Sequence, residues 1–212
     1  MLYLKSFCFN PFQQNTYIVY DDAGTAIIID PGNFTSSENT QLTNFISEKK
    51  LNLRRLLLTH AHIDHILGNK FIFDTYNLLP EVHKDDVYFI DNMTKSGAMY
   101  GVNCEQSPSP ITYINNGDVI KLGNYEFECI FTPGHSPGSI SFYNKENNLL
   151  ISGDVLFYGS IGRTDLPMGN HQTLINSIKQ RLFVLPDDTK VYSGHGQPTT
   201  IGFEKMNNPF LT

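Results

Sequence analysis

The run from Thr59 to His65 constrains this chain more than any other feature, because it places three histidines and one aspartate within seven residues. Protonated imidazoles this close repel one another, and neutral imidazoles buried beside a carboxylate leave polar atoms without partners. A bound metal ion meets both needs, since imidazole nitrogens and carboxylate oxygens are common metal ligands. The spacing therefore favours a metal site over a solvated, histidine-rich turn, with four candidate ligands: His60, His62, Asp64 and His65.

The run directly follows a predicted strand. Residues 54–58 end in three consecutive leucines, a short apolar stretch that is typical of a buried strand. A helix is expected to begin near His65 and to carry apolar residues at Ile66, Leu67, Phe71 and Ile72. The candidate ligands thus lie beyond the carboxyl end of a strand, where open sheets bind their ligands.

Three more candidate ligands follow predicted strands in the second half of the chain. His135 follows a strand at 126–132, Asp154 follows one at 149–152, and His195 follows one at 189–192. Each of them alone is more typical of a turn or a cap. Together with the first run they bring the set to five imidazoles and two carboxylates, too many for one tetrahedral ion and suitable for two.

The remaining sequence predicts one mixed domain over residues 1–212. Strands at 17–20 and 25–30, joined by a turn at 21–24, indicate a hairpin, and amphipathic helices are expected at 37–50 and 171–183. A chain of 212 residues that is 40% hydrophobic can bury one substantial core. Residues 93–112 lack periodicity and are expected to form a flap over the site.

The net charge and the cysteine content limit which binding partners and which cellular compartment are expected. The net charge is −6 without clustered Lys and Arg, which argues against nucleic acid as a partner and leaves a small-molecule substrate. The amino-terminal residues do not resemble a secretory signal, and no apolar stretch is long enough to cross a membrane. Cys8, Cys104 and Cys129 are odd in number and show no Cys-x-x-Cys spacing, so free thiols and the cytoplasm are expected.

The motifs around these residues resemble those of one family, the metallo-β-lactamase superfamily, and within it the chain is similar to short bacterial hydroxyacylglutathione hydrolases (glyoxalase II). The resemblance covers most of the chain and is carried by 15–17, 30–32, 59–68, 132–139, 152–157, 162–165 and 194–196. It implies an α/β fold, a four-layer αββα sandwich with the site along one edge of two sheets.

The resemblance also implies a division of the ligands between two divalent cations. One cation would be held by His60, His62 and His135 and the other by Asp64, His65 and His195, with Asp154 bridging them. Two close cations lower the pKa of a shared water from about 16 toward neutrality, which supplies a hydroxide nucleophile. The expected reaction is hydrolysis of a thioester such as S-lactoylglutathione or a related hydroxyacyl thioester, with Asp64 also orienting the hydroxide proton. Zinc is the expected metal, although iron and manganese accept the same ligands.

Arg163 is the candidate substrate-binding residue. It occupies the place where long glyoxalase II enzymes present a Lys toward the glycine carboxylate of glutathione, and a cation there suits any anionic substrate. A local ion pair between Arg163 and Asp165 is an equally open interpretation. Because few residues follow His195, the resemblance implies an incomplete glutathione clamp.

Other functions remain open at the level of sequence. An iron-dependent persulfide dioxygenase of the same superfamily would hold one iron with His60, His135 and Asp154, and it shares the run Gly-Arg-Thr-Asp at 162–165. A secreted β-lactamase is less favoured, because those enzymes usually carry Cys where Asp154 stands. Lactonase and phosphodiesterase activities carry lower weight. A non-catalytic, metal-stabilised interaction domain is disfavoured, because seven ligands on two ions leave room for water.

Overall fold

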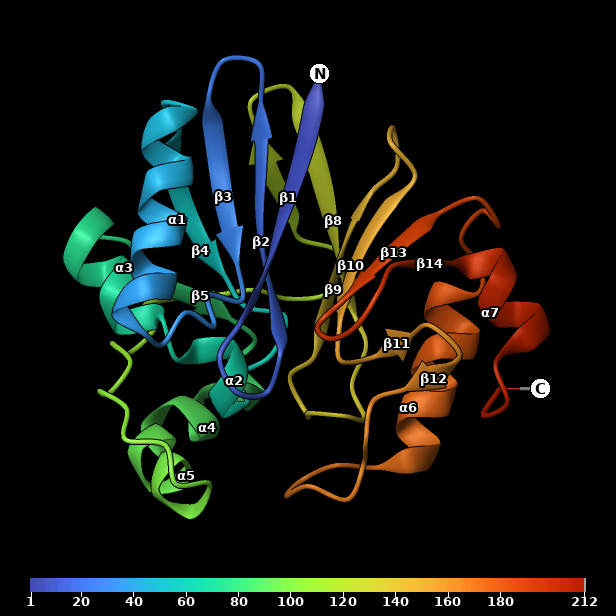
Figure 1. Cartoon of the computed structure of the whole chain (residues 1–212). Coiled ribbons are helices and arrows are strands. Elements are labelled where there is room, and N and C mark those ends of the chain that lie inside the picture. The colour runs from blue at the N-terminus through green and yellow to red at the C-terminus, as the bar shows by residue number, and fades with distance from the viewer. Residues whose placement is uncertain (212) are drawn as a thin grey trace.

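The computed structural model describes residues 1–211 and contains two six-stranded sheets packed face to face. Helices cover the outer face of each sheet, so the layers follow the order helix, sheet, sheet, helix (Figure 1). The predicted αββα sandwich is therefore confirmed.

The first sheet is built mainly from the amino-terminal half of the chain. Its strands are, in spatial order, β1 (Leu2–Phe9), β2 (Gln14–Asp21), β3 (Thr25–Ile29), β4 (Asn52–Leu57), β5 (Pro80–Val82) and β6 (Thr112–Tyr113). The strands β1, β2 and β3 pair antiparallel, which confirms the predicted hairpin, and the strands from β3 to β6 pair parallel. The Asp21 carboxylate closes the β2–β3 turn by accepting a hydrogen bond from the Thr25 amide at 2.9 Å.

The second sheet comes from the carboxyl-terminal half. Its order is β14 (Thr199–Thr200), β13 (Lys190–Ser193), β10 (Leu149–Gly153), β9 (Ile140–Asn144), β8 (Tyr125–Phe131) and β7 (Val119–Leu122). The neighbouring strands β10 and β13 pair parallel, so their carboxyl ends lie at the same edge. A small hairpin, β11 (Leu156–Phe157) and β12 (Ser160–Ile161), follows β10.

Helices α1 (Ser36–Glu48), α2 (Ile63–Ile66), α3 (Asn69–Tyr76), α4 (Val87–Asp91) and α5 (Met93–Met99) lie on the side of the first sheet, with a 3₁₀ turn at Lys84–Asp86 (Figure 1). Helices α6 (His171–Ser177) and α7 (Ile201–Asn207) cover the second sheet, and a π-helical turn at Ile178–Leu182 extends α6. Thr35 and Glu38 form a capping box at the start of α1.

One predicted helix differs from the structure. The sequence predicts a single helix from near His65, whereas the structure has α2 and α3 separated at Leu67–Gly68. The Gly68 amide donates to the Pro31 carbonyl at 2.7 Å, and a Cβ at Gly68 would lie 2.1 Å from Asn33 Oδ1. The helix therefore breaks where its backbone packs closely against the loop after β3, a long-range contact that periodicity does not encode.

Successive side chains of a strand belong to different core clusters, one between the first sheet and its helices and one between the two sheets. In β3, Ile28 packs with Leu42 of α1, whereas Ile27 and Ile29 pack with Phe142 of the second sheet. A third cluster joins the outer face of the second sheet to α6, with members such as Leu150 and Leu174. Strands buried on both faces explain the continuous apolar runs in the sequence.

Within residues 1–211, no helix has the length and apolar character needed to cross a bilayer. Cys8, Cys104 and Cys129 are all unpaired, as the sequence predicts. The division into domains is not tested by the fold itself, so one domain over 1–212 stays a prediction.

Candidate metal centre

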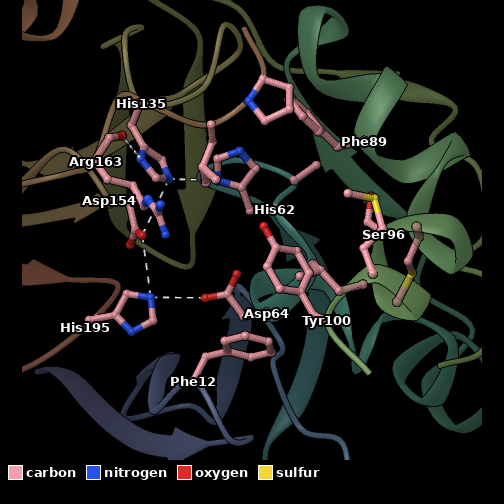
Figure 2. A pocket seen from close by; sticks show the side chains of 16 residues that line it. Phe12, His62, Asp64, Phe89, Ser96, Tyr100, His135, Asp154, Arg163 and His195 are labelled. Carbon is pink, nitrogen blue, oxygen red and sulfur yellow. Dashed lines mark hydrogen bonds and ion pairs between the residues drawn. The ribbon is translucent and has the colours of Figure 1, made fainter. Parts of the chain in front are cut away.

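All seven candidate ligands lie at one edge of the two sheets. His60 and His62 lie in the loop after β4, and Asp64 and His65 lie on α2. His135 comes from the β8–β9 loop, Asp154 follows β10 and His195 follows β13. Figure 2 shows the side chains of His62, Asp64, His135, Asp154 and His195 pointing toward one another.

Backbone contacts join the two sheets at this edge. The Asn15 amide of β2 donates to the Gly194 carbonyl at 2.7 Å, and the Ile140 amide of β9 donates to the Thr59 carbonyl at 2.8 Å. Gly153 pairs with Ser193 in the parallel register, which brings the residues after β10 and β13 side by side. These contacts fix the loops that carry the candidate ligands from both halves of the chain.

Glycine is required where these loops approach each other. Gly153 has φ +54°, and a Cβ there would lie 2.3 Å from Thr59 Oγ1. A Cβ at Gly194 would lie 2.0 Å from Asp154 Oδ1. The glycines in the runs Ser152-Gly153-Asp154 and Ser193-Gly194-His195 therefore allow the two loops to approach the Thr59–His65 loop and each other.

Six of the seven side chains fall into two groups. Donor atoms of His60, His62 and His135 lie within 4.8 Å of one another, and so do those of Asp64, His65 and His195. In the first group, His62 Nδ1 is 2.8 Å from His135 Nε2. In the second, Asp64 Oδ2 is 3.1 Å from His195 Nε2 and 3.6 Å from His65 Nε2.

Asp154 lies between the two groups. Its Oδ2 is 3.5 Å from His135 Nε2 and 3.5 Å from His195 Nε2, and its Oδ1 is 3.3 Å from His65 Nε2. The carboxylate thus contacts members of both groups at once, which is the position that a bridging ligand requires.

The outer nitrogen of each of three imidazoles is fixed by an acceptor. His135 Nδ1 donates to the Arg163 carbonyl at 2.7 Å, and His195 Nδ1 donates to the Gln13 carbonyl at 3.2 Å. His65 Nδ1 lies 2.9 Å from Asp30 Oδ2. Such partners select the tautomer whose Nε2 carries a lone pair, the form that binds metal.

His60 is oriented through a relay. The Thr59 hydroxyl donates its one proton to Asp30 Oδ2 at 2.5 Å, so its oxygen accepts from His60 Nδ1 at 3.1 Å. Asp30 therefore sets the tautomers of both His60 and His65. Its backbone has φ +51° and its side chain is buried.

The charge state of the cluster follows from burial and from the carboxylates. Burial and the neighbouring imidazoles hold the pKa of His60 well below its usual value and lower the pKa of His62 to about 3, so both rings are neutral near pH 7. Burial opposes protonation of His65, yet three carboxylates raise its pKa well above its usual value: Asp64, Asp154 and Asp30. That negative charge favours a cation at His65 Nε2, and a proton and a metal ion compete for that position.

Unpartnered buried atoms show that the residues fit metal ions. His60 Nε2, His65 Nε2 and Asp154 Oδ1 are buried without a hydrogen-bond partner among the described residues. In native proteins such atoms are rare unless water or an ion satisfies them. In the first group, two ring nitrogens at 2.8 Å also require a proton or a cation between them. The cluster has the donor set of a divalent metal centre.

Two buried aspartates that support the site were not among the predicted site residues. Asp30, described above, follows β3 directly. Asp86 accepts hydrogen bonds from the Ala61 amide at 2.8 Å, from the Gly138 amide at 2.6 Å and from the Ser136 hydroxyl. Asp86 thereby joins the loop that carries His60 and His62 to the loop that carries His135. A buried aspartate in a short turn gives no sequence signal for this long-range role.

A cavity of about 320 Å³ opens beside the cluster. The predicted flap contributes to its wall, because Met93, Ser96, Met99 and Tyr100 line it, although residues 93–99 form helix α5 where no helix was predicted. Arg163 also lines the cavity, and its guanidinium forms a bidentate ion pair with Asp165 at 2.7 Å through both Nε and Nη2. The local ion pair considered from the sequence is therefore present, and contact of Arg163 with substrate stays a prediction.

Comparison with known proteins agrees with this geometry. Residues 9–195 match the family model described as Metallo-beta-lactamase superfamily. Hydroxyacylglutathione hydrolase GloC of Haemophilus influenzae is 39% identical over 202 residues, which cover 94% of this chain and 93% of GloC. The crystal structure of BLEG-1 B3 metallo-beta-lactamase has a TM-score of 0.91 and 37% identity, covering 99% of this chain and 100% of that one. The crystal structure of TTHA1623 in a di-iron-bound form has a TM-score of 0.88 and 34% identity, covering 98% and 100%. The chain belongs to the metallo-β-lactamase superfamily.

Proposed function

We propose that this metallo-hydrolase cleaves thioesters, with S-lactoylglutathione and related hydroxyacyl thioesters as the substrate class. The observation that carries the proposal is the convergence of seven donor side chains, five of which line a cavity, with the Nε2 lone pairs of four imidazoles held inward. The similarity to GloC, named as a hydroxyacylglutathione hydrolase, supports the reaction class.

In this proposal His60, His62 and His135 hold one divalent cation, Asp64, His65 and His195 hold a second, and Asp154 bridges them. When bound, the cations lower the pKa of water toward neutrality and polarise a carbonyl group. Zinc is the metal that we propose.

The chain's own residues position protons around that chemistry. Burial alone would raise the pKa of Asp64, but His65 and His195 hold it below its usual value, so its carboxylate accepts protons and does not donate them near pH 7. Asp64 lines the cavity, and its Oδ2 lies 3.1 Å from His195 Nε2. It is thereby placed to accept a proton from a nucleophilic water and to orient it. A thiolate leaves readily, so no separate general acid is required for a thioester.

The test combines metal content with hydrolysis of two lactoyl thioesters, that of glutathione and that of an uncharged thiol. His62→Ala and Asp154→Ala should each lose at least one metal ion per chain and most activity, whereas His171→Ala, at an exposed position on α6, should retain both. Retention of full metal and activity in both cluster variants would overturn the ligand assignment. Hydrolysis of a β-lactam without hydrolysis of either thioester would overturn the proposed substrate class.

A second candidate is an iron-dependent persulfide dioxygenase that uses His60, His135 and Asp154. The similar TTHA1623 structure in a di-iron-bound form favours iron as a metal for this site, and the run 162–165 matches that branch of the family. Metal analysis separates the two proposals. One iron per chain together with oxygen uptake on glutathione persulfide would favour the oxidation, whereas two ions and thioester cleavage without oxygen would favour hydrolysis.

A further inference from the structure

The cavity wall facing the metal cluster is apolar. Figure 2 shows Phe12, Phe89 and Tyr100 across the cavity from His195, Asp154 and His135. Phe12 and Tyr100 form an edge-to-face pair with ring centroids 5.9 Å apart. The other apolar side chains of the wall come from the loop after β4, from α2 and α5, and from the loop before α6, and they are Ala61, Ile63, Met93, Met99, Leu166 and Pro167. A surface of this kind binds uncharged groups through the hydrophobic effect.

Apart from the proposed cations, the cavity wall offers little positive charge to an anionic ligand. Arg163 is the one Lys or Arg among the described residues that line it. Two of its guanidinium nitrogens, Nε and Nη2, already donate to the two oxygens of Asp165, which neutralises its charge and leaves Nη1 and the second Nη2 hydrogen for another acceptor. The Arg163 pair holds the pKa of Asp165 down, to about 2, so the pair persists throughout the physiological range.

This pairing carries a consequence for charged substrates. Glutathione brings two carboxylates and one ammonium group, and its carboxylates would have to compete with Asp165 for Arg163. Both side chains are exposed, with 60% of Arg163 and 68% of Asp165 accessible, so Asp165 can be displaced at modest cost. The pair therefore lowers the affinity for anionic ligands without closing the cavity.

We infer, on the basis of the proposed thioesterase function, that the site selects thioesters with an uncharged apolar thiol portion, and that Asp165 disfavours anionic substrates by masking Arg163. The apolar wall supplies binding for an alkyl or aryl group, and the neutralised guanidinium supplies only a weakened attraction for carboxylates. Asp165 acts as a specificity residue that contacts Arg163 and not the reacting atoms.

The experiment uses the metal-loaded enzyme and two substrates with the same acyl group, S-lactoylglutathione and the lactoyl thioester of benzyl mercaptan. The wild-type enzyme should show the higher kcat/KM for the benzyl thioester. Asp165→Asn should raise the ratio of kcat/KM for the glutathione thioester to that for the benzyl thioester about fivefold, since an exposed ion pair is worth up to about that factor. The gain should shrink in 0.5 M salt, because screening weakens attraction between exposed charges.

Binding of glutathione, measured by calorimetry, gives a readout that does not depend on turnover. Its Kd should fall about fivefold in Asp165→Asn relative to wild type. Asp188→Asn is the matched control, because it removes the same charge from an exposed residue. Asp188 precedes β13 and His195 follows it, so Asp188 lies at the end of this strand that is remote from the site. This substitution should change neither the Kd nor the ratio.

The outcomes separate this inference from the proposed function. If neither thioester is hydrolysed, the proposed function fails. If both are hydrolysed and the glutathione thioester is preferred, or if Asp165→Asn leaves the ratio and the Kd unchanged, the function stands and the selection by Asp165 is wrong.

Discussion

Replacement of Asp30 by Asn tests how the site controls the protonation of its imidazoles. Asp30 Oδ1 accepts from the Thr59 amide at 2.7 Å, and Oδ2 accepts from the Thr59 hydroxyl at 2.5 Å and from His65 Nδ1 at 2.9 Å. Asn is nearly isosteric and tolerates the positive φ of this position. If the side-chain oxygen of the introduced asparagine still accepts from the Thr59 backbone amide, its NH₂ group replaces Oδ2. That NH₂ group then faces the Thr59 hydroxyl and His65 Nδ1, both of which donate in the wild type.

The consequence is a change of tautomer. His65 Nδ1 must become an acceptor, which moves the ring proton to Nε2, the atom that faces Asp154. The Thr59 hydroxyl, now an acceptor from Asn, turns its proton toward His60 Nδ1, which moves the proton of His60 as well. Both imidazoles then present N–H groups to the centre in place of lone pairs. Because loss of such an orienting partner typically costs 10–100-fold in metal affinity, and two ligands are affected, we expect about 100-fold, or about 2.7 kcal/mol.

The assay is competition between the protein and a chromophoric zinc chelator, with metal content measured in parallel. Asp74→Asn on α3 is the control, because it removes the same charge from an exposed residue paired with Lys70. Nitrogen-15 NMR of the imidazoles, recorded without metal, should show His60, whose low pKa keeps it neutral, in the Nδ1–H form in the wild type and in the Nε2–H form in Asp30→Asn. Wild-type zinc affinity in Asp30→Asn, or an unchanged tautomer, would refute the reasoning.

Three further predictions follow from the structure. Iodoacetamide at pH 8 should label exposed Cys8 in the folded protein and Cys129 only after unfolding, because burial raises the pKa of the Cys129 thiol to about 12; equal labelling rates in peptide mass spectrometry would contradict this. Removal of metal with EDTA should lower the Tm by about 10 °C, since an ion present at about 1,000 times its Kd stabilises by about 4 kcal/mol; an unchanged calorimetric Tm would exclude tight binding. Gly153→Ala should destabilise the protein in urea by more than the ~1–2 kcal/mol strain of the left-handed backbone, because its Cβ would also clash with Thr59 Oγ1. Gly159→Ala, at φ +63° with no described atom within 4 Å of its Cβ, should show that strain alone, so equal losses would refute the clash.

The structure brings together the seven candidate ligands that the sequence indicated, whereas the contacts that hold them could not be predicted from the sequence. The Thr59–His65 run was informative because four donors lie close together along the chain, and His135, Asp154 and His195 were informative because each follows a strand. Layers and strands followed from hydrophobic periodicity and from the family resemblance.

Most of the features that the sequence did not predict depend on contacts between distant parts of the chain. The break between α2 and α3 depends on packing of Gly68 against the Pro31 loop. Helix α5 contains Gly97 and has only a few buried residues, so its periodicity is weak. Asp86 is 25 residues from Ala61 and 50 from Ser136, and no local pattern indicates that it joins those two loops.

The contacts that hold the loops of the site are made by residues other than the candidate ligands. A ligand atom that is displaced by about 1 Å contributes much less to metal affinity. The geometry of the site therefore depends on the contacts that hold the ligand-bearing loops in place. Here the loops are fixed by backbone pairing of Asn15 with Gly194, by Ile140 with Thr59, and by the carboxylates of Asp30 and Asp86. None of these groups is a proposed metal ligand, and each joins segments from different layers or loops. Substitutions at these loop contacts should therefore alter metal affinity and reactivity even though every proposed ligand is still present. The presence of the ligand motifs is thus not enough to predict the activity of a relative with this fold.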